Sequence, residues 1–262
     1  MPLTSRSSRL LKRSASAAAA LAITGAALSA QSVELPFAPG ERLAYSVRTS
    51  RLGNVGTGTM SVEGPETVRD VEAYVLRFDL RARVGFISAA DRTASWIDPH
   101  RMASLRFQKH ERHPLSKHDE NVELYPLDQR WQRSPSDTGV SPTDDPLDEL
   151  SFIYFVRTLA LDVDATYELH RHFEAGRNPI RVTVVRRDTL TTPAGTFPTV
   201  LVELRVRDPR RYRGEGVIAI HLSDDRYRIP VRITSSMPML GSTILTLTSH
   251  SYPAAYAASS AH

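Results

Sequence analysis

VIAIHLSDDRYRIPVRIT, at residues 217–234, is the stretch of sequence that decides the fold. An apolar run rich in β-branched residues extends from Val217 to Leu222 and leads into an acidic turn. A second apolar run begins at Pro230 and alternates with polar residues. Two such runs around a turn predict a β-hairpin.

The same alternation of apolar and polar residues recurs along most of the chain. Six candidate strands precede any convincing helix, which favours an antiparallel sheet. Polar, Ser-rich and Pro-rich residues 130–145 are expected to form a loop between two groups of strands. Outside the hairpin, the candidate strands are 42–48, 57–61, 72–83, 94–97, 105–108, 122–125, 167–173, 180–184, 200–206 and 242–248.

A single helix is expected from about residue 147 to residue 159. Asp145 is the expected N-cap and Pro146 suits the first helical position, while Asp148 and Glu149 place negative charge near the helix N-terminus. The fold class predicted from these patterns is mainly β: an antiparallel curved sheet or partly open β-barrel with one embedded α-helix.

The first 30 residues have the pattern of a secretory signal peptide. Four basic side chains precede an apolar run at residues 17–28, and small residues follow. Without these four, 33 − 4 = 29 basic residues balance 29 acidic ones, so the rest of the chain gives no reason to expect nucleic-acid binding. We expect a signal peptide at 1–30, one antiparallel β domain at 31–252 and a disordered tail at 253–262.

The chain contains no cysteine, which excludes disulfides and a lipid-modified N-terminal cysteine. About 230 residues after the leader suffice for one sizeable core. No later apolar run is long enough for a transmembrane helix. The mature protein is therefore expected in the periplasm or outside the cell.

Four segments in order along the chain resemble a bacterial family known as domain of unknown function 3108. The resemblance implies an exported, mainly antiparallel β protein with a single embedded helix, and it implies no reaction. His221 departs from the family pattern, in which an aromatic residue commonly precedes the acidic turn. The four segments are PFAPGERLAYSV at 36–47, PLDELSFIYFVRTL at 146–159, TPAGTFPTVLVEL at 192–204 and HLSDDRYRIPVRIT at 221–234.

The acidic turn is the first candidate binding site. Asp224 and Asp225 are adjacent, so on a strand they would point to opposite faces, whereas in a turn their usual role is to cap the local backbone. Turn capping is favoured over ligand binding and over acid–base chemistry. With these two we group His221, Arg228 and Arg157, the last late in the expected helix, as candidate binding residues.

His170 and His172 are the candidate metal ligands. An H-x-H pair on a strand can offer two imidazoles to zinc or copper, but a solvated polar face is the favoured interpretation. Three further histidines lie in KHERHPLSKHDE at 109–120, where a proline interrupts the cluster. Ser151 with His221 and Asp224 has the residue types of a nucleophilic triad, but no G-x-S-x-G turn surrounds it.

The favoured function is a non-enzymatic envelope protein that binds a lipid-like or other hydrophobic ligand on the concave side of its sheet. The first alternative is an envelope hydrolase that acts on carbohydrate or ester through an Asp/His site. The second is a structural partner in an envelope complex. A basic run at 205–213 adds anionic lipid or polysaccharide as possible contacts, and no cofactor is expected.

Overall fold

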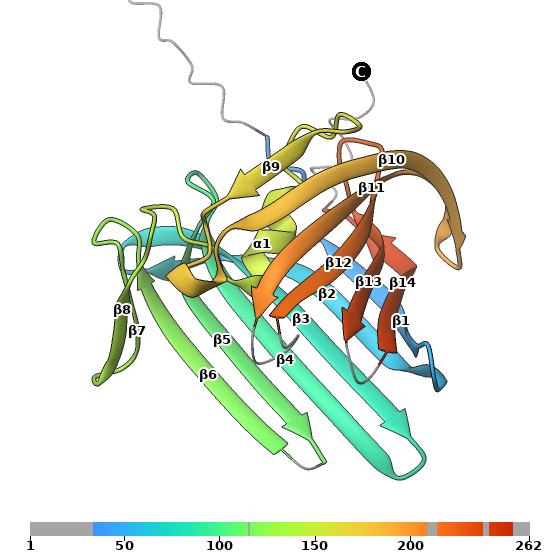
Figure 1. Ribbon diagram of the computed structural model, residues 1–262, viewed down its shortest axis with the longest axis horizontal. Helices are drawn as coiled ribbons and strands as arrows, with labels where there is room; N and C mark the ends of the chain where they lie inside the picture. The colour runs from blue at the N-terminus through green and yellow to red at the C-terminus, as the bar shows by residue number, and fades with distance from the viewer. Residues whose placement is uncertain (1–33, 115, 209–213, 238–240, 254–262) are drawn as a thin grey trace, which may run out of the picture. The chain divides into compact units, whose positions relative to one another are not determined.

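The computed structural model describes residues 34–114, 116–208, 214–237 and 241–253. The predicted signal peptide at 1–30 and most of the predicted tail lie outside these residues. Within them, fourteen strands form one antiparallel sheet, with order β8-β7-β6-β5-β4-β3-β2-β1-β14-β13-β12-β11-β10-β9. The predicted fold class is confirmed: an antiparallel sheet that curls without closing, around one α-helix (Figure 1).

Adjacent strands of the sheet run in opposite directions, and each strand pairs with the next one in the chain, with one exception. β8 and β9, which α1 separates, do not pair and form the two edges of the sheet. One further pair joins β1 to β14 in the middle of the sheet. Their bounds are β1 Arg42–Thr49, β2 Gly53–Val68, β3 Val71–Val84, β4 Ile87–Asp98, β5 Ala103–His113, β6 Ser116–Tyr125, β7 Arg130–Ser134, β8 Asp137–Val140, β9 Thr166–Leu169, β10 Ile180–Thr192, β11 Gly195–Asp208, β12 Gly214–Ser223, β13 Pro230–Met237 and β14 Gly241–Ser251. The short 3₁₀ helix η1 is Ala175–Arg177.

The hairpin predicted from residues 217–234 is β12 and β13. Ile220 lies opposite Ile233, and both belong to the main core. The expected loop at 130–145 is wrong in part, because β7 and β8 form a short hairpin there. Gly139 lets the two strands approach, since a Cβ at that position would lie 2.3 Å from the Trp131 ring. The polar composition of these residues gave no indication of this hairpin at the edge of the sheet.

The helix α1, Glu149–Val156, is shorter than expected and starts three residues later than the predicted N-cap implies. Asp148, not Asp145, is the N-cap: its Oδ1 accepts hydrogen bonds from the N–H groups of Leu150 and Ser151, both at 2.9 Å. Asp145 instead pairs with Arg101 in an exposed turn. Asp148 is preferred because its second oxygen also finds buried partners on the sheet.

Those partners are two serine hydroxyls of the sheet. Ser95 on β4 donates to Asp148 Oδ2 at 2.5 Å, and Ser104 on β5 donates to the same oxygen at 2.7 Å. All three residues are fully buried. The helix N-terminus is thus fixed to β4 and β5 by hydrogen bonds, which leaves its apolar side chains free to contact the other strands.

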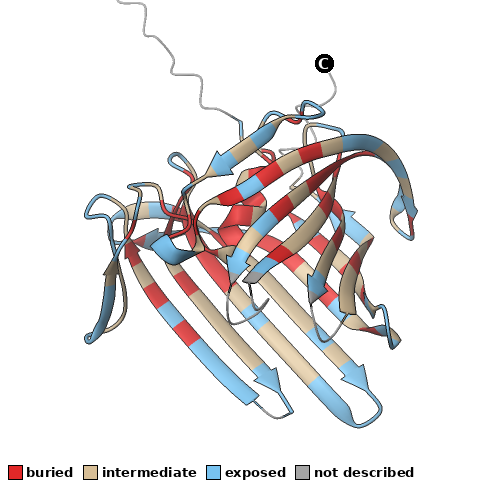
Figure 2. Ribbon diagram, viewed as in Figure 1, coloured by how far each residue is buried: buried red, intermediate tan, exposed pale blue. Residues whose placement is uncertain are grey.

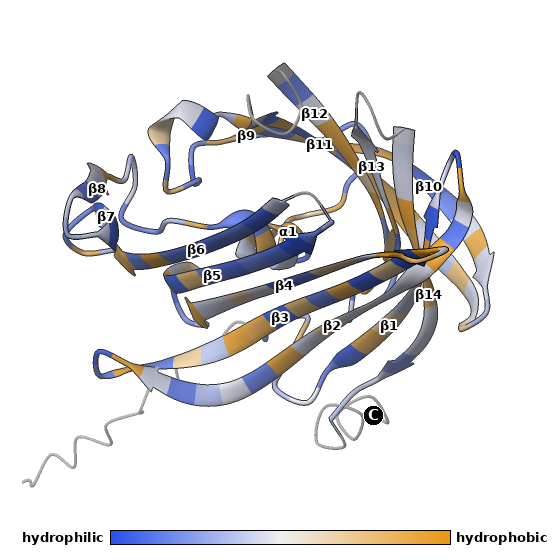
Figure 3. Ribbon diagram, turned by 90° about the horizontal axis from the view of Figure 1, so that it is seen from below, coloured by the Kyte–Doolittle hydropathy of each residue, from blue (hydrophilic) through white to orange (hydrophobic). Residues whose placement is uncertain are grey.

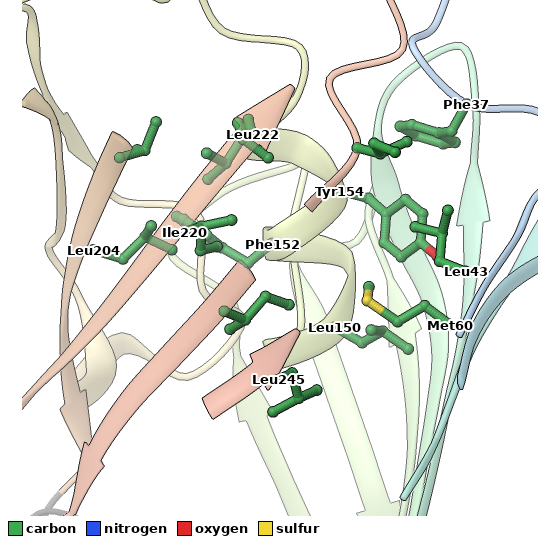
Figure 4. Close-up of a cluster of buried hydrophobic side chains, with 14 of the residues drawn as sticks. Phe37, Leu43, Met60, Leu150, Phe152, Tyr154, Leu204, Ile220, Leu222 and Leu245 are labelled. Carbon is green, nitrogen blue, oxygen red and sulfur yellow. The ribbon is translucent and has the colours of Figure 1, made fainter. Parts of the chain in front are cut away.

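The apolar side chains of α1 reach both sides of the curled sheet. Figure 4 shows Phe152 directed toward Ile220 of β12, while Tyr154 points toward Phe37 and Leu43 near β1. Buried residues accordingly gather around the helix in Figure 2. We call the side of the sheet that faces α1 the inner face and the opposite side the outer face.

The turns divide between two ends of the sheet. One end, which we call the helix end, carries the β4–β5 turn and the β12–β13 turn. The opposite end, which we call the hairpin end, carries the β1–β2 turn and the β3–β4 turn at 85–86. None of the helices in the part of the chain described here has the length and apolarity to span a bilayer.

Candidate functional site

The acidic turn between β12 and β13 is held together by Asp225. Its Oδ1 accepts hydrogen bonds from Ser223 Oγ at 2.8 Å and from the N–H groups of Tyr227 and Arg228 at 2.9 and 3.0 Å. The last two bonds satisfy backbone N–H groups of the turn that form no hydrogen bond within a strand pair. Turn capping, the interpretation favoured for both aspartates, is confirmed for Asp225.

Asp224 points away from that network. Its Oδ2 accepts a hydrogen bond from Nε of Arg187 on β10 at 3.0 Å, and its N–H donates to the carbonyl of Pro198. The two adjacent carboxylates therefore serve different neighbours. Carboxylates that diverge in this way do not flank one substrate bond, as the carboxylate pair of a glycosidase must.

Arg228 connects the turn to the end of α1. Its Nη1 donates to the carbonyls of Arg157 and Leu159, which follow the last residue of the helix. A cation at this position compensates the unpaired carbonyls and the negative end of the helix dipole. Arg228 thus has a structural partner on another element, and its guanidinium contacts backbone oxygens.

Arg157 is completely buried and makes an ion pair that the sequence did not suggest. Its guanidinium donates to both carboxylate oxygens of Glu41, at 2.8 and 2.7 Å, and to the carbonyls of Pro36 and Tyr227. Burial lowers the pKa of Arg157, but the Glu41 carboxylate, together with Tyr154 and Tyr45, raises it, and the net shift is upward. The side chain grouped with the binding residues is therefore enclosed among protein groups.

His221 lies on the outer face of β12, opposite Leu201 of β11 and Arg232 of β13. Its buried Nδ1 has no hydrogen-bond partner among the described residues. Burial and the nearby Arg232 lower the pKa of His221, while Asp188 opposes them. The neutral imidazole is therefore favoured, and the charged groups that influence it come from β10 and β13, not from the acidic turn.

Replacing His221 by phenylalanine is expected to reduce the acid sensitivity of the fold. Because the folded-state pKa of His221 lies below the unfolded value of 6.5, its contribution to stability is complete above pH 6.5 and is lost as pH falls toward the folded-state pKa. Urea denaturation at pH 7.5 and pH 5 measures this. The wild type should lose more free energy of unfolding on acidification than H221F; equal losses would contradict the assignment.

The predicted metal ligands occupy unlike environments. β9 ends at Leu169, so His170 and His172 lie beyond the strand on which the shared face was predicted, and that part of the prediction is wrong. His170 is exposed near Glu168, whereas His172 is buried, stacks on Phe173 and accepts a hydrogen bond at Nδ1 from the Glu174 N–H.

Within the described residues, one group of three side chains has metal-ligating atoms close together: Asp91, Glu111 and His113, within 4.8 Å of one another. His113 Nε2 lies 2.8 Å from Asp91, and Glu111 lies 3.3 Å from the Lys109 ammonium. Both carboxylates of the group therefore already have a side-chain partner within the protein. His113 belongs to the histidine-rich segment noted in the sequence, but its partner on β4 could not be foreseen.

Ser151 has a structural role. Its Oγ accepts a hydrogen bond from the Asp148 N–H at 2.8 Å and lies 2.8 Å from Ser104 Oγ. Both contacts belong to the buried hydrogen-bond network at the helix N-terminus. The side chain is fully buried. The residue types of a triad are present in the chain, but this serine completes a capping box.

The inner face becomes progressively less covered away from the helix. Along β3 the inward side chains change from fully buried Leu76, through partly buried Phe78, Leu80 and Ala82, to Val84, which is 40% exposed. β11 and β12 show the same change, from buried Leu204 and Ile220 to partly buried Val206 and Ile218. Figure 3 shows apolar residues along these strands.

The inward side chains of β4 and β5 are different in kind. Strand pairing places four polar side chains on the inner face, beside the apolar inward side chains of β3: Asp91, Lys109, Glu111 and His113. The uncovered part of the inner face therefore combines an apolar surface on β3, β11 and β12 with a charged surface on β4 and β5. An amphipathic molecule matches such a surface better than a fully apolar one.

The family of the chain is shown by its sequence over most of its length. The family model described as a protein of unknown function, DUF3108, matches residues 44–248. The chain belongs to the DUF3108 family. This confirms the resemblance found from the four segments, and no curated protein matches the DUF3108 chain.

A solved structure with a TM-score above 0.5 shares the fold of this DUF3108 protein, and two others align with it at lower scores. A β-barrel-like protein of the domain of unknown function DUF1849 from Brucella abortus has a TM-score of 0.54 and 13% identity, over 84% of this chain and 100% of that one. A candidate lipoprotein from Parabacteroides distasonis has a TM-score of 0.34 and 10% identity, over 83% and 97% of the two chains. A candidate exported protein with a YmcC-like fold from Bacteroides fragilis has a TM-score of 0.30 and 12% identity, over 83% and 98%.

Proposed function

We propose that this DUF3108 protein is an exported, non-enzymatic binding protein of the cell envelope that holds a lipid-like molecule on the uncovered part of its inner face. The observation that carries the proposal is the loss of burial along β3 from Leu76 to Val84, where no element among the described residues covers the apolar inward side chains. Export is inferred from the leader pattern at residues 1–30.

The ligand would lie on an open apolar surface. Two shallow hollows in the described residues both include Ala90 and Arg112, whose side chains belong to the outer face, so neither is a cavity beneath α1. An acyl chain could lie along Leu80 and Ile218 while its polar end meets the charged side chains of β4 and β5. Affinity would then depend on the apolar residues more than on any single polar contact.

A titration with a lysophospholipid that carries a saturated acyl chain tests this proposal. Leu80→Glu places a charge on the uncovered inner face and is expected to weaken binding by about tenfold or more, because the acyl chain would meet a desolvated carboxylate. Isothermal titration calorimetry measures the affinity. Thr57→Glu on the exposed outer face of β2 is the matched control and should bind as the wild type does.

Two results would count against the proposal. The first is a wild type that fails to bind the lysophospholipid below its critical micelle concentration. The second is L80E with unchanged affinity, provided that both variants unfold at the same denaturant concentration as the wild type. Mass spectrometry of protein purified from its own envelope would show separately whether a natural lipid is retained.

A further inference from the structure

The β3–β4 hairpin ends in an exposed apolar tip. Val84, Phe86 and Ile87 are 40%, 95% and 51% exposed, and Gly85 provides the turn between the strands. A phenylalanine this exposed is unusual, and neighbouring exposed apolar side chains commonly mark an interaction site. Figure 2 shows the exposed tip of β3 and β4 far from the buried residues around α1.

The outer face next to this tip is rich in arginine. Two of its four arginines form ion pairs, one with Asp79 and one with Asp119, and the other two have no carboxylate partner among the residues that the structure describes. Four positive charges against two negative ones leave this face with an excess of positive charge. The four are Arg81 and Arg83, which are unpaired, and Arg92 and Arg112, which are paired.

The arginines surround two shallow hollows. One of about 450 Å³ is lined by Ala90, Arg92, His110 and Arg112, and the neighbouring one of about 370 Å³ shares Ala90 and Arg112. The second is also lined by Arg81, Arg83 and the short side chain of Ser88. Short side chains between guanidinium groups leave room for a compact anion such as a phosphate.

Arg83 links the two features. Its Nε donates a hydrogen bond to the carbonyl of Gly85 at 3.0 Å, so one arginine both supports the turn and keeps its charge beside the apolar tip. The apolar tip and the basic face therefore have a fixed mutual arrangement. The tip and the basic face can therefore contact the same surface at once, provided that its interior is apolar and its boundary is negatively charged.

We propose that the hairpin end docks on a membrane surface that contains anionic lipids. The tip enters the boundary between head groups and acyl chains, and the arginines contact lipid phosphates. An apolar element flanked by Arg and Lys is the pattern that binds such an interface. This proposal does not depend on the proposed ligand at the inner face.

Vesicle co-sedimentation tests the proposal, with phosphatidylcholine vesicles that either lack phosphatidylglycerol or contain one third of it. The wild type is expected to bind the anionic vesicles and to dissociate as salt rises. Phe86→Asp removes the apolar anchor, and the double variant R81E/R83E reverses two charges; each should weaken binding by about tenfold or more.

Leu127→Asp is the matched control for Phe86→Asp. Leu127 is 80% exposed and lies between β6 and β7, at the helix end of the sheet, so the same loss of an exposed apolar side chain occurs far from the arginines. It should bind vesicles as the wild type does. A wild type that ignores anionic vesicles, or L127D weakened as much as F86D, overturns the proposal.

A fluorescent side chain at the tip reports insertion directly. In Phe86→Trp, anionic vesicles should shift the added tryptophan emission to shorter wavelength, and lipids brominated on the acyl chain should quench it. Leu127→Trp should show neither effect. The lysophospholipid titration separates the two proposals: F86D should retain the affinity of the wild type for the lysophospholipid, while L80E should retain vesicle binding.

Discussion

Replacing Arg157 by alanine is expected to lower the free energy of unfolding by about 3–5 kcal/mol, the usual cost of leaving one partner of a buried ion pair uncompensated. Arg157 and Glu41 are 0% and 1% exposed, and the guanidinium also satisfies the carbonyls of Pro36 and Tyr227. Without it, Glu41 must either bind a proton or remain charged in the core. Equilibrium denaturation in urea at neutral pH measures the change.

The double variant E41M/R157M distinguishes loss of the pair from loss of packing. Two methionines fill similar volume without charge, so this variant should be far more stable than R157A. Arg101→Ala is the control for removing an exposed pair, because Arg101 contacts Asp144 and Asp145 near the surface. It should change stability by less than about 1 kcal/mol. If R157A unfolds like R101A, the buried pair has no structural importance.

Replacing Asp148 by alanine is expected to cost about 3–5 kcal/mol, since one residue caps α1 and joins it to the sheet. The change leaves two N–H groups of the helix and the hydroxyls of Ser95 and Ser104 without their acceptor. Urea denaturation measures the loss, and far-ultraviolet circular dichroism shows whether the native baseline changes.

Asp148→Asn is the matched variant and also gives a pH test. The amide oxygen can still accept the two N–H groups, so D148N should stay within about 1 kcal/mol of the wild type. Burial raises the pKa of Asp148, although the Ser95 hydroxyl and the other donors lower it in part. A raised folded-state pKa means that its contribution to stability is present in acid and is lost as pH rises through that pKa. Relative to D148N, the wild type should therefore become less stable as pH rises from 3 to 6.

The sheet could be predicted from the sequence because burial imposes a period of two on each long strand. Residues 217–234 contain enough of that pattern to give both strands and the turn, and the four family segments fix the order of the elements. The helix was found from its apolar spacing. Its start was misplaced because Asp145, Asp148 and Pro146 all suit a helix N-terminus, and only the serines of β4 and β5 decide among them.

The contacts that define the candidate sites could not be predicted in the same way. Glu41 and Arg157 are separated by 116 residues, and nothing in either local sequence indicates the other. The charged surface of β4 and β5 likewise depends on which face of each strand turns inward. The exposed tip at Phe86 left a weak signal, a glycine between apolar residues, which alternation alone interprets as more strand.

The first and last strands, β1 and β14, pair in the middle of the sheet, with Tyr45 opposite Leu247. On either side of this seam, most strand pairs are hairpins that can form from neighbouring segments. The seam itself requires closure of a loop of about 200 residues, so it forms slowly and only after the last strand has been synthesised. Until then the chain consists of two incomplete sheets with open edges. A variant truncated before residue 241 lacks β14 and should therefore never complete the fold.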